Sequence, residues 1–171
     1  MSKQTILTRT ALLLAITLIF QSLRFFIPIP PLFSTFLVGS LVNATLLISL
    51  SAVGLLPALF LAVIAPLVAY FQQLLLLPIF ILPVAAGNMV YVGVFFLLWA
   101  RGGMLAAATA ASSKTLLLYL TFSWLLSWVN IPPKIASGLL FVMSWPQLVT
   151  ALAGAALASI ISRRLRNLSD N

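Results

Sequence analysis

Apolar residues run in long blocks along this chain, and short stretches with proline or polar residues separate the blocks. A bilayer core takes about 20 apolar residues per helix, and six blocks approach that length, at about 8–27, 36–52, 57–72, 79–99, 104–128 and 140–162. The blocks are apolar throughout instead of alternating, which favours helices over a β-barrel. The sequence therefore predicts one all-α domain over residues 1–171, an integral membrane bundle of six transmembrane helices.

Composition agrees with this prediction. Hydrophobic residues make up 63% of the chain and charged residues 6%, with a mean hydropathy of +1.24. A water-soluble exterior needs far more charge than this. The net charge of +8 comes from dispersed Lys and Arg near segment ends, where such charges usually set topology. We therefore expect membrane lipid around the chain, and no nucleic acid.

Six spans place both termini on the same side of the membrane. The inner side then carries Lys3, Arg9, Arg101, Arg163, Arg164 and Arg166. The outer side carries only Arg24 and Lys134, so the positive-inside rule predicts that both termini are cytoplasmic. The outer connections, at 28–35, 73–78 and 129–139, are longer and richer in proline than the inner ones. This asymmetry indicates a site that opens outward under loops.

The predicted membrane region contains no acidic residue and no histidine; the one carboxylate side chain belongs to Asp170. Transporters that couple to protons or sodium generally use an intramembrane Asp, Glu or His. Active transport by this chain would therefore draw its energy from another subunit. The chain also lacks Cys, a metal-binding cluster and a Ser/His/Asp set, so we expect no metal, no cofactor and no enzymatic activity.

Lys114 lies near the middle of the segment 104–128. A lysine within the bilayer costs a few kcal/mol, so it normally faces an interior or aqueous cavity and has a partner. No acidic residue is available there. The partner is then a backbone carbonyl, an amide side chain, water or an anionic ligand, and the sequence leaves these alternatives open.

The first segment has a polar face and a face of small residues. Thr10, Thr17, Gln21 and Arg24 are spaced seven, four and three apart, so they stack on one face that should look inward. Arg24 then either lines a site or reaches the outer headgroups. Small residues occupy a second face: Thr8, Ala11, Ala15 and Ser22. Such residues allow close helix approach, either within the chain or to another membrane protein.

Amides and aromatic residues supply the other candidate ligand-binding groups. Asn88 and Tyr91 share a face of the fourth segment, and Asn43 lies at mid-depth in the second. Each serves either interhelical bonding or ligand binding. Trp128, Trp145 and Gln147 lie near outer helix ends, either in an interfacial belt or around a planar polar ligand. Small residues at 106–111 and at Ala151, Gly154, Ala155, Ala158 and Ser159 are expected to pack between helices.

The chain resembles the substrate-binding subunits, or S components, of energy-coupling-factor vitamin transporters. The resemblance covers nearly the whole length and rests on size, six spans and the first helix, Thr8-Arg9-Thr10-Ala11-Leu12-Leu13-Leu14-Ala15. Within that helix, Ala11-x-x-x-Ala15 matches the motif by which the family docks on its transmembrane scaffold subunit. The resemblance implies a compact six-helix bundle in a prokaryotic cytoplasmic membrane, with substrate held in the outer half. It maps the first outer loop to 28–35 and the second to 72–78.

The resemblance also implies partners: the scaffold subunit and two cytoplasmic ATPases, which would supply the energy. We therefore expect a high-affinity subunit that captures a vitamin or vitamin precursor. The candidate substrate-binding residues are Arg24, Asn43, Asn88, Tyr91, Lys114, Trp128, Trp145 and Gln147, and the docking residues are Ala11 and Ala15. The basic centre favours an anionic or electron-rich ligand. A neutral ligand such as a cobalamin fits if the protein itself satisfies Lys114.

Two other functions compete with this expectation. A self-contained passive permease or channel would need a polar path across the membrane, but polar residues thin out in the inner half. A structural membrane scaffold protein would bind no small molecule and would tolerate Lys114→Met. As a binding subunit, the chain should lose ligand affinity in Lys114→Met while still folding, and partner docking in Ala11→Trp.

Overall fold

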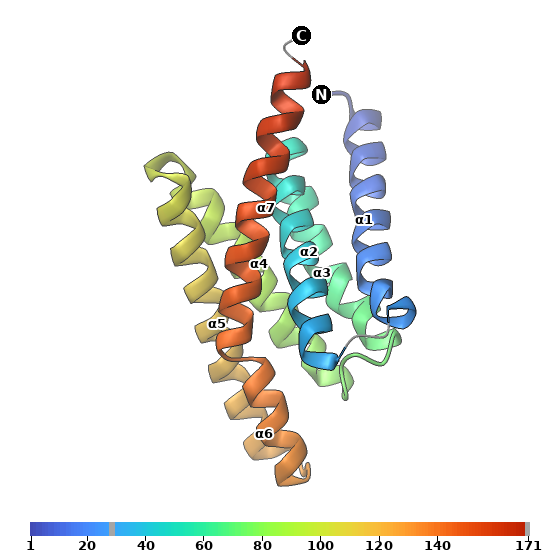
Figure 1. Ribbon diagram of the computed structural model, residues 1–171, viewed down its shortest axis with the longest axis vertical. Coiled ribbons are helices and arrows are strands. Elements are labelled where there is room, and N and C mark those ends of the chain that lie inside the picture. The colour runs from blue at the N-terminus through green and yellow to red at the C-terminus, as the bar shows by residue number, and fades with distance from the viewer. Residues whose placement is uncertain (28–29, 170–171) are drawn as a thin grey trace.

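The computed structural model describes residues 1–27 and 30–169, and Figure 1 shows helices throughout this part of the chain. The long helices are α1 (Lys3–Phe26), α2 (Pro31–Ala52), α3 (Leu55–Phe71), α4 (Ile81–Leu98), α5 (Gly103–Trp128) and α7 (Trp145–Ser169). A short helix, α6 (Pro133–Val142), precedes α7, and the 3₁₀ turns η1 (Pro78–Phe80) and η2 (Trp99–Arg101) flank α4. The prediction of an all-α fold is confirmed for the described residues.

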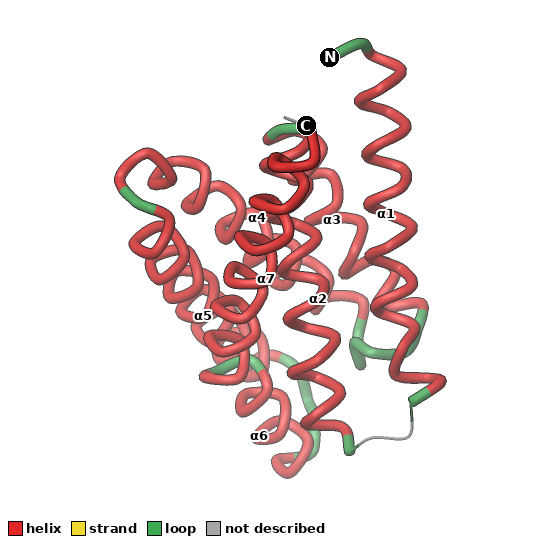
Figure 2. Tube along the Cα trace, turned by 45° about the horizontal axis from the view of Figure 1, so that its top comes forward, coloured by secondary structure: helices red, strands yellow, loops and turns green. Residues whose placement is uncertain are grey.

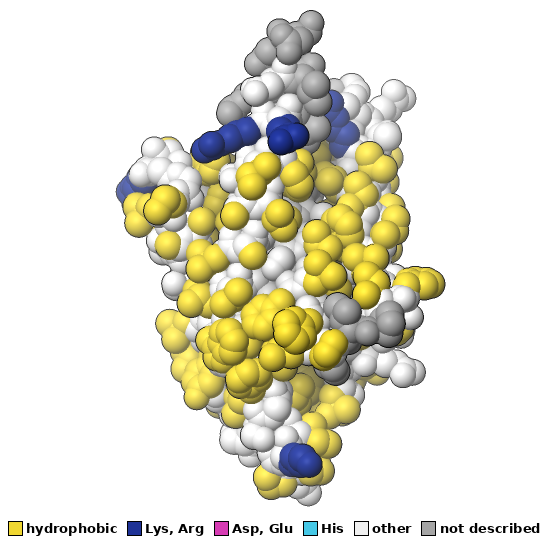
Figure 3. Space-filling view, in the orientation of Figure 1, with side chains coloured by type: hydrophobic (Ala, Val, Ile, Leu, Met, Phe, Trp, Pro, Cys, Tyr) yellow, Lys and Arg dark blue, Asp and Glu magenta, His cyan; other side chains and the backbone are white. Residues whose placement is uncertain are grey.

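Five helical stretches are long and apolar enough to cross a membrane, which is compatible with a multi-pass membrane protein. α6 and α7 count together as one of them, and α3 is not among them because it has only 17 residues. Such a helix is at the lower limit for crossing a bilayer. Both termini lie at the same end of the bundle (Figure 1). Basic side chains gather at that end on the face shown in Figure 3.

Two helices begin earlier than predicted. α1 begins at Lys3 because the Ser2 hydroxyl caps it, accepting a hydrogen bond from the Thr5 N–H at 3.2 Å. α2 begins at Pro31 because proline is favoured at the first helical position. The predicted outer loop 28–35 is therefore wrong for residues 31–35. Pro28, Ile29, Asp170 and the side chain of Arg166 lie outside the described residues.

The predicted last span, 140–162, is also wrong in its bounds. Pro133 begins α6 inside the predicted loop 129–139, for the same reason that Pro31 begins α2. The chain breaks at Met143 and Ser144, and α7 then runs from Trp145 to Ser169. The three spans predicted at 57–72, 79–99 and 104–128 agree with α3, α4 and α5 to within two residues.

Helices α2 and α7 approach each other closely where α7 carries a glycine. A Cβ atom added to Gly154 would lie 2.5 Å from Asn43 Cβ and 2.9 Å from the Ser40 carbonyl oxygen, both on α2. A Cβ atom added to Gly39 of α2 would likewise lie 3.0 Å from Thr150 Cγ2 of α7. The small residues predicted to pack include buried Ala106, Ala110, Ala111, Ala151, Ala155 and Ala158. Their packing role is confirmed.

Helix α1 lies at the edge of the bundle and packs on α2 and α3 (Figure 2). Within its most apolar 18 residues, 11% are buried, against 50% for α2. The buried residues of α1 are Thr17 and Gln21, so the polar stripe does look inward, as predicted. Ala11 and Ala15, on another face of α1, are exposed.

Candidate functional site

Lys114 lies in the middle of the bundle and is only 3% exposed. The buried residues of α5 recur every three or four positions, and this spacing places Lys114 on the same face as Ala110, Ala111 and Leu118. That face packs against α4 and α7. The sequence of α5 therefore brings an ammonium group into the interior together with small and apolar side chains.

Two neutral amides hold the ammonium group. Lys114 Nζ donates to Asn43 Oδ1 at 2.6 Å and to Asn88 Oδ1 at 2.9 Å. It also lies 5.3 Å from the centroid of the Tyr91 ring, within cation–π range. Of the alternatives that the sequence leaves open for the partner of Lys114, the structure shows amide side chains. We call Asn43, Asn88, Tyr91 and Lys114 the polar hub.

Asn88 is held in place by a carbonyl that its own helix leaves without a donor. Pro66, inside α3, has no N–H to offer the carbonyl of Ala62, four residues earlier. Asn88 Nδ2 donates to this carbonyl across the helix interface at 3.3 Å. A backbone defect in α3 thus orients the Asn88 amide so that its oxygen faces Lys114.

Asn43 and Tyr91 connect the hub to α7. Asn43 Nδ2 donates to Thr150 Oγ1 at 3.4 Å, which is long for such a bond. The Tyr91 hydroxyl donates to the Ala151 carbonyl at 2.6 Å, and Tyr91 is fully buried. The hub therefore ties five helices together: α2, α3, α4, α5 and α7.

Apolar clusters pack along α5 on both sides of the hub. Toward the end with the termini, Ala106 and Ala110 belong to a cluster with Leu61 and Phe95. In the other direction, Leu118, Phe122 and Leu125 pack with residues including Phe80. The described contacts thus enclose a charged centre between two apolar layers.

The polar stripe of α1 forms a second network. The hydroxyl oxygens of Thr17 and Thr45 lie 2.9 Å apart, and Gln21 Nε2 donates to the Ala65 carbonyl at 2.9 Å. Arg24 is half-buried, and its Nε donates to the Gln21 carbonyl at 3.3 Å. The contacts of Thr17 and Gln21 dock α1 onto α2 and α3, whereas the Arg24 bond lies within α1.

The tryptophan candidates, Trp128 and Trp145, make their contacts apart from the hub. Trp128 is 76% exposed, and its ring lies beside that of Trp124 in a tilted arrangement, with 6.1 Å between ring centroids. Trp145 is 50% exposed and lies between Phe36 and Phe141, at 5.7 Å from each. Both environments are compatible with an interfacial belt of aromatic residues as well as with a pocket for a planar polar ligand.

Gln147 has a local structural contact. Its Nε2 donates to the Val142 carbonyl at 3.2 Å, across the break between α6 and α7. Pro146 has no N–H to donate to the Val142 carbonyl, which lies four residues before it, so this carbonyl is open to the Gln147 side chain. Of the eight candidate binding residues, the structure brings together Asn43, Asn88, Tyr91 and Lys114, while Arg24, Trp128, Trp145 and Gln147 make their described contacts elsewhere.

Three groups that bond to the hub are not among the binding residues predicted from the sequence. Thr150 and the carbonyls of Ala62 and Ala151 complete the hub. Pro66 gives a signal for Ala62, because a proline inside a helix frees the carbonyl four residues before it. The pairing of Tyr91 with Ala151 has no such signal, because it depends on how α4 crosses α7.

Comparison with known proteins found no match: no family model, curated protein or solved structure resembles the chain closely enough. The resemblance to S components therefore depends on the residues quoted from the sequence.

Proposed function

We propose that the protein is the substrate-binding subunit of an ATP-driven micronutrient importer in a prokaryotic cytoplasmic membrane. Both termini would lie in the cytoplasm, and a scaffold subunit with two ATPases would supply the energy. The chain itself would catalyse no reaction. The observation that carries this proposal is the exposed small-residue face of α1, formed by Thr8, Ala11 and Ala15.

This face has no packing role in the described structure. The alanines of α5 and α7 are buried against other helices, whereas Ala11 and Ala15 are exposed on the helix at the edge of the bundle. In lipid, small residues stabilise helix contacts by allowing two backbones to approach closely. An exposed small-residue face is therefore well suited to docking another transmembrane helix.

The hub supports a subunit without a transport path of its own. It holds a cation and no acidic residue, so it lacks the groups that usually couple transport to protons or sodium. The apolar clusters around Ala110 and Phe122 leave no continuous line of polar side chains through the described core. The first feature argues against a transporter that energises itself, and the second argues against a passive channel.

The hub also bears on the substrate. Because two amide oxygens already satisfy Lys114, an anionic group is not required to keep it buried. An anionic or electron-rich substrate would replace the oxygen of Asn43 or Asn88 at Lys114 Nζ, and a rotated amide could then donate to the same group. A neutral substrate would leave the hub intact and bind nearer to the outer loops.

A co-purification experiment tests the docking surface. The chain would be expressed with the genes for a scaffold subunit and two ATPases from the same cell, and captured by an affinity tag. We expect the wild type to retain all three partners and Ala11→Trp to lose them, because an indole prevents close helix approach. Leu12→Trp is the matched control, since Leu12 is exposed beside this face and is already large. Equal retention by both variants would contradict the proposed docking face.

A further inference from the structure

The end of the bundle with the termini carries cations for which residues 1–27 and 30–169 supply no acidic side chain. The exposed basic side chains there are Lys3, Arg9, Arg101, Arg163 and Arg164. The only acidic residue of the chain is Asp170, which lies outside the described residues. Negative charge for this end must therefore come largely from outside residues 1–27 and 30–169.

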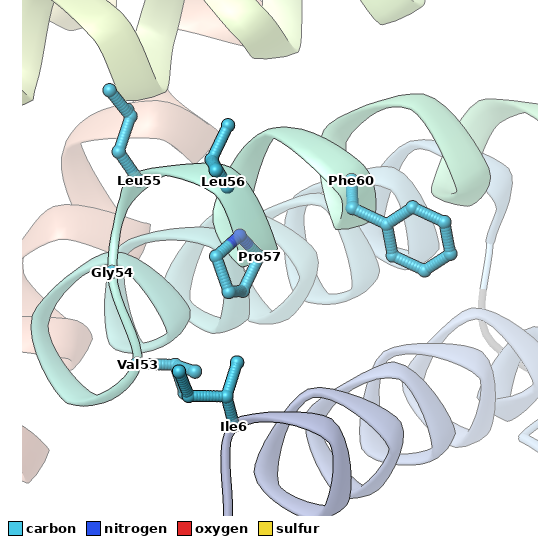
Figure 4. A pocket seen from close by; sticks show the side chains of 7 residues that line it. All are labelled: Ile6, Val53, Gly54, Leu55, Leu56, Pro57 and Phe60. Carbon is cyan, nitrogen blue, oxygen red and sulfur yellow. The ribbon is translucent and has the colours of Figure 1, made fainter. Parts of the chain in front are cut away.

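An open apolar groove lies at the same end, between the start of α1 and the start of α3 (Figure 4). Ile6 lines one side, and Val53 and the first turns of α3 as far as Phe60 line the other. Its volume is about 500 Å³, within the range of small-molecule sites. Leu56 is 79% exposed and Phe60 is 50% exposed, so the groove is accessible from the side of the bundle.

Arg9 stands at the rim of this groove. It lies three residues after Ile6, on the next turn of α1, and its Nη1 is 3.5 Å from the carbonyl oxygen of Ala52, directly before Val53. Its other described contact is a weak one, from Nη1 to Met1 Sδ at 3.9 Å. The described residues offer no acceptor to the other guanidinium nitrogens, which remain available to an anion at the mouth of the groove.

We propose that this groove binds an anionic phospholipid, with an acyl chain along Ile6, Leu56 and Phe60 and the phosphate on Arg9. The apolar acyl chain matches the apolar lining of the groove, and the negatively charged headgroup matches the Arg9 guanidinium. The lining side chains have no hydrogen-bonding group that would hold a peptide backbone. A second copy of the chain would bring another net charge of +8 to a basic surface, which like-charge repulsion disfavours. The inference does not depend on the proposed transport function.

Native mass spectrometry of the delipidated full chain tests this site. Phosphatidylglycerol and phosphatidylcholine with identical acyl chains are titrated separately, and inorganic phosphate is titrated as a third probe. We expect one phosphatidylglycerol to bind at least fivefold more tightly than phosphatidylcholine, as one cation near a lipid headgroup predicts. Arg9→Gln should remove this preference, and Ile6→Trp should weaken both lipids by filling the groove.

Two control variants separate this site from general surface effects. Arg101→Gln removes a cation at the same end outside the groove, and Leu7→Trp adds an indole at an exposed position next to Ile6. Both should keep the wild-type affinities and preference. Leu56→Asn replaces an exposed lining residue, so it serves if Ile6→Trp does not fold, and it should weaken both lipids.

Four results would overturn the inference. The first is equal affinity for the two lipids. The second is a loss of preference in Arg101→Gln as large as in Arg9→Gln, which would indicate diffuse surface charge. The third is binding of inorganic phosphate as tight as that of phosphatidylglycerol. The fourth is a dimer that Ile6→Trp abolishes, which would make a second copy the occupant.

Discussion

Lys114 Nζ lies 2.6 Å from Asn43 Oδ1, so a neutral amide is the nearest described partner of the buried cation. Charged hydrogen bonds of this kind are short and roughly twice as strong as neutral ones. Asn88 Oδ1 supplies the second acceptor. The ammonium group is thus stabilised by side-chain dipoles from two other helices, α2 and α4, and its position depends on how those helices pack.

Asn43→Ala should destabilise the protein by about 2 kcal/mol, because it removes one acceptor from a buried cation. Adding Lys114→Met in the same chain should recover part of this loss, since the cation that lacks a partner is gone. A double-mutant cycle on unfolding in detergent measures the coupling, and we expect more than about 1 kcal/mol. Strictly additive effects would show that the 2.6 Å contact contributes little.

Tyr91 makes two separable contributions to the hub. Tyr91→Phe removes the hydrogen bond to the Ala151 carbonyl but keeps the ring beside Lys114, so we expect a loss of about 1 kcal/mol. Tyr91→Leu removes the ring as well and should cost more, because cation–π stabilisation and core packing are both lost. Melting temperatures in detergent rank the variants. Equal melting temperatures for the two would argue against a role for the ring.

Gly154→Ala should separate α2 from α7. The added methyl would overlap Asn43 Cβ and lie 2.9 Å from the Ala44 backbone nitrogen, which cannot move without its helix. We expect a loss of about 2 kcal/mol. Gly93→Ala is the control, because its Cβ would meet nothing within 4 Å; alanine there should be neutral or slightly stabilising. Similar melting temperatures for both variants would contradict the close approach of α2 and α7.

Sequence patterns predicted the helices well where apolar blocks end at clear breaks. The bounds of α3, α4 and α5 follow from Gly54, Gln72, Pro78 and Gly102, which mark turns. The errors in where helices start occur at Lys3, where the Ser2 cap begins α1 early, and at Pro31 and Pro133, where proline begins a helix at its first position. The same residue type both breaks and starts helices, and local sequence alone does not distinguish these roles.

The hub was only partly predictable. The cost of burying Lys114 predicts that it has a partner, and helical spacing places Asn88 and Tyr91 on one face. Which acceptor reaches Lys114 depends on the crossing of α2 and α4 with α5, which is a tertiary property. Arg24, Trp128, Trp145 and Gln147 lie near the ends of their predicted segments, whereas Lys114 lies near the middle of its own. Whether such residues share one site depends on how the helices pack, which their sequence positions do not give.

Lys114→Met provides a prediction about substrate binding. It leaves the oxygens of Asn43 and Asn88 without their donor, so some loss of stability accompanies any loss of function. For an anionic substrate, we expect the ligand-induced rise in melting temperature to disappear, measured relative to the melting temperature of the unliganded variant. For a neutral substrate, the rise should persist. A Lys114→Met protein with unchanged affinity for an anionic substrate would exclude Lys114 from the binding site.

The most direct measurement is a thermal-shift titration of the purified wild-type protein in detergent, across a panel of vitamins and their precursors. A ligand that binds only the folded state raises the melting temperature in proportion to the logarithm of its concentration once the site is saturated. A substrate-binding subunit should give a large, concentration-dependent rise of this form with one compound or one close chemical series. No rise with any compound, together with no co-purifying ATPase, would contradict the proposed function.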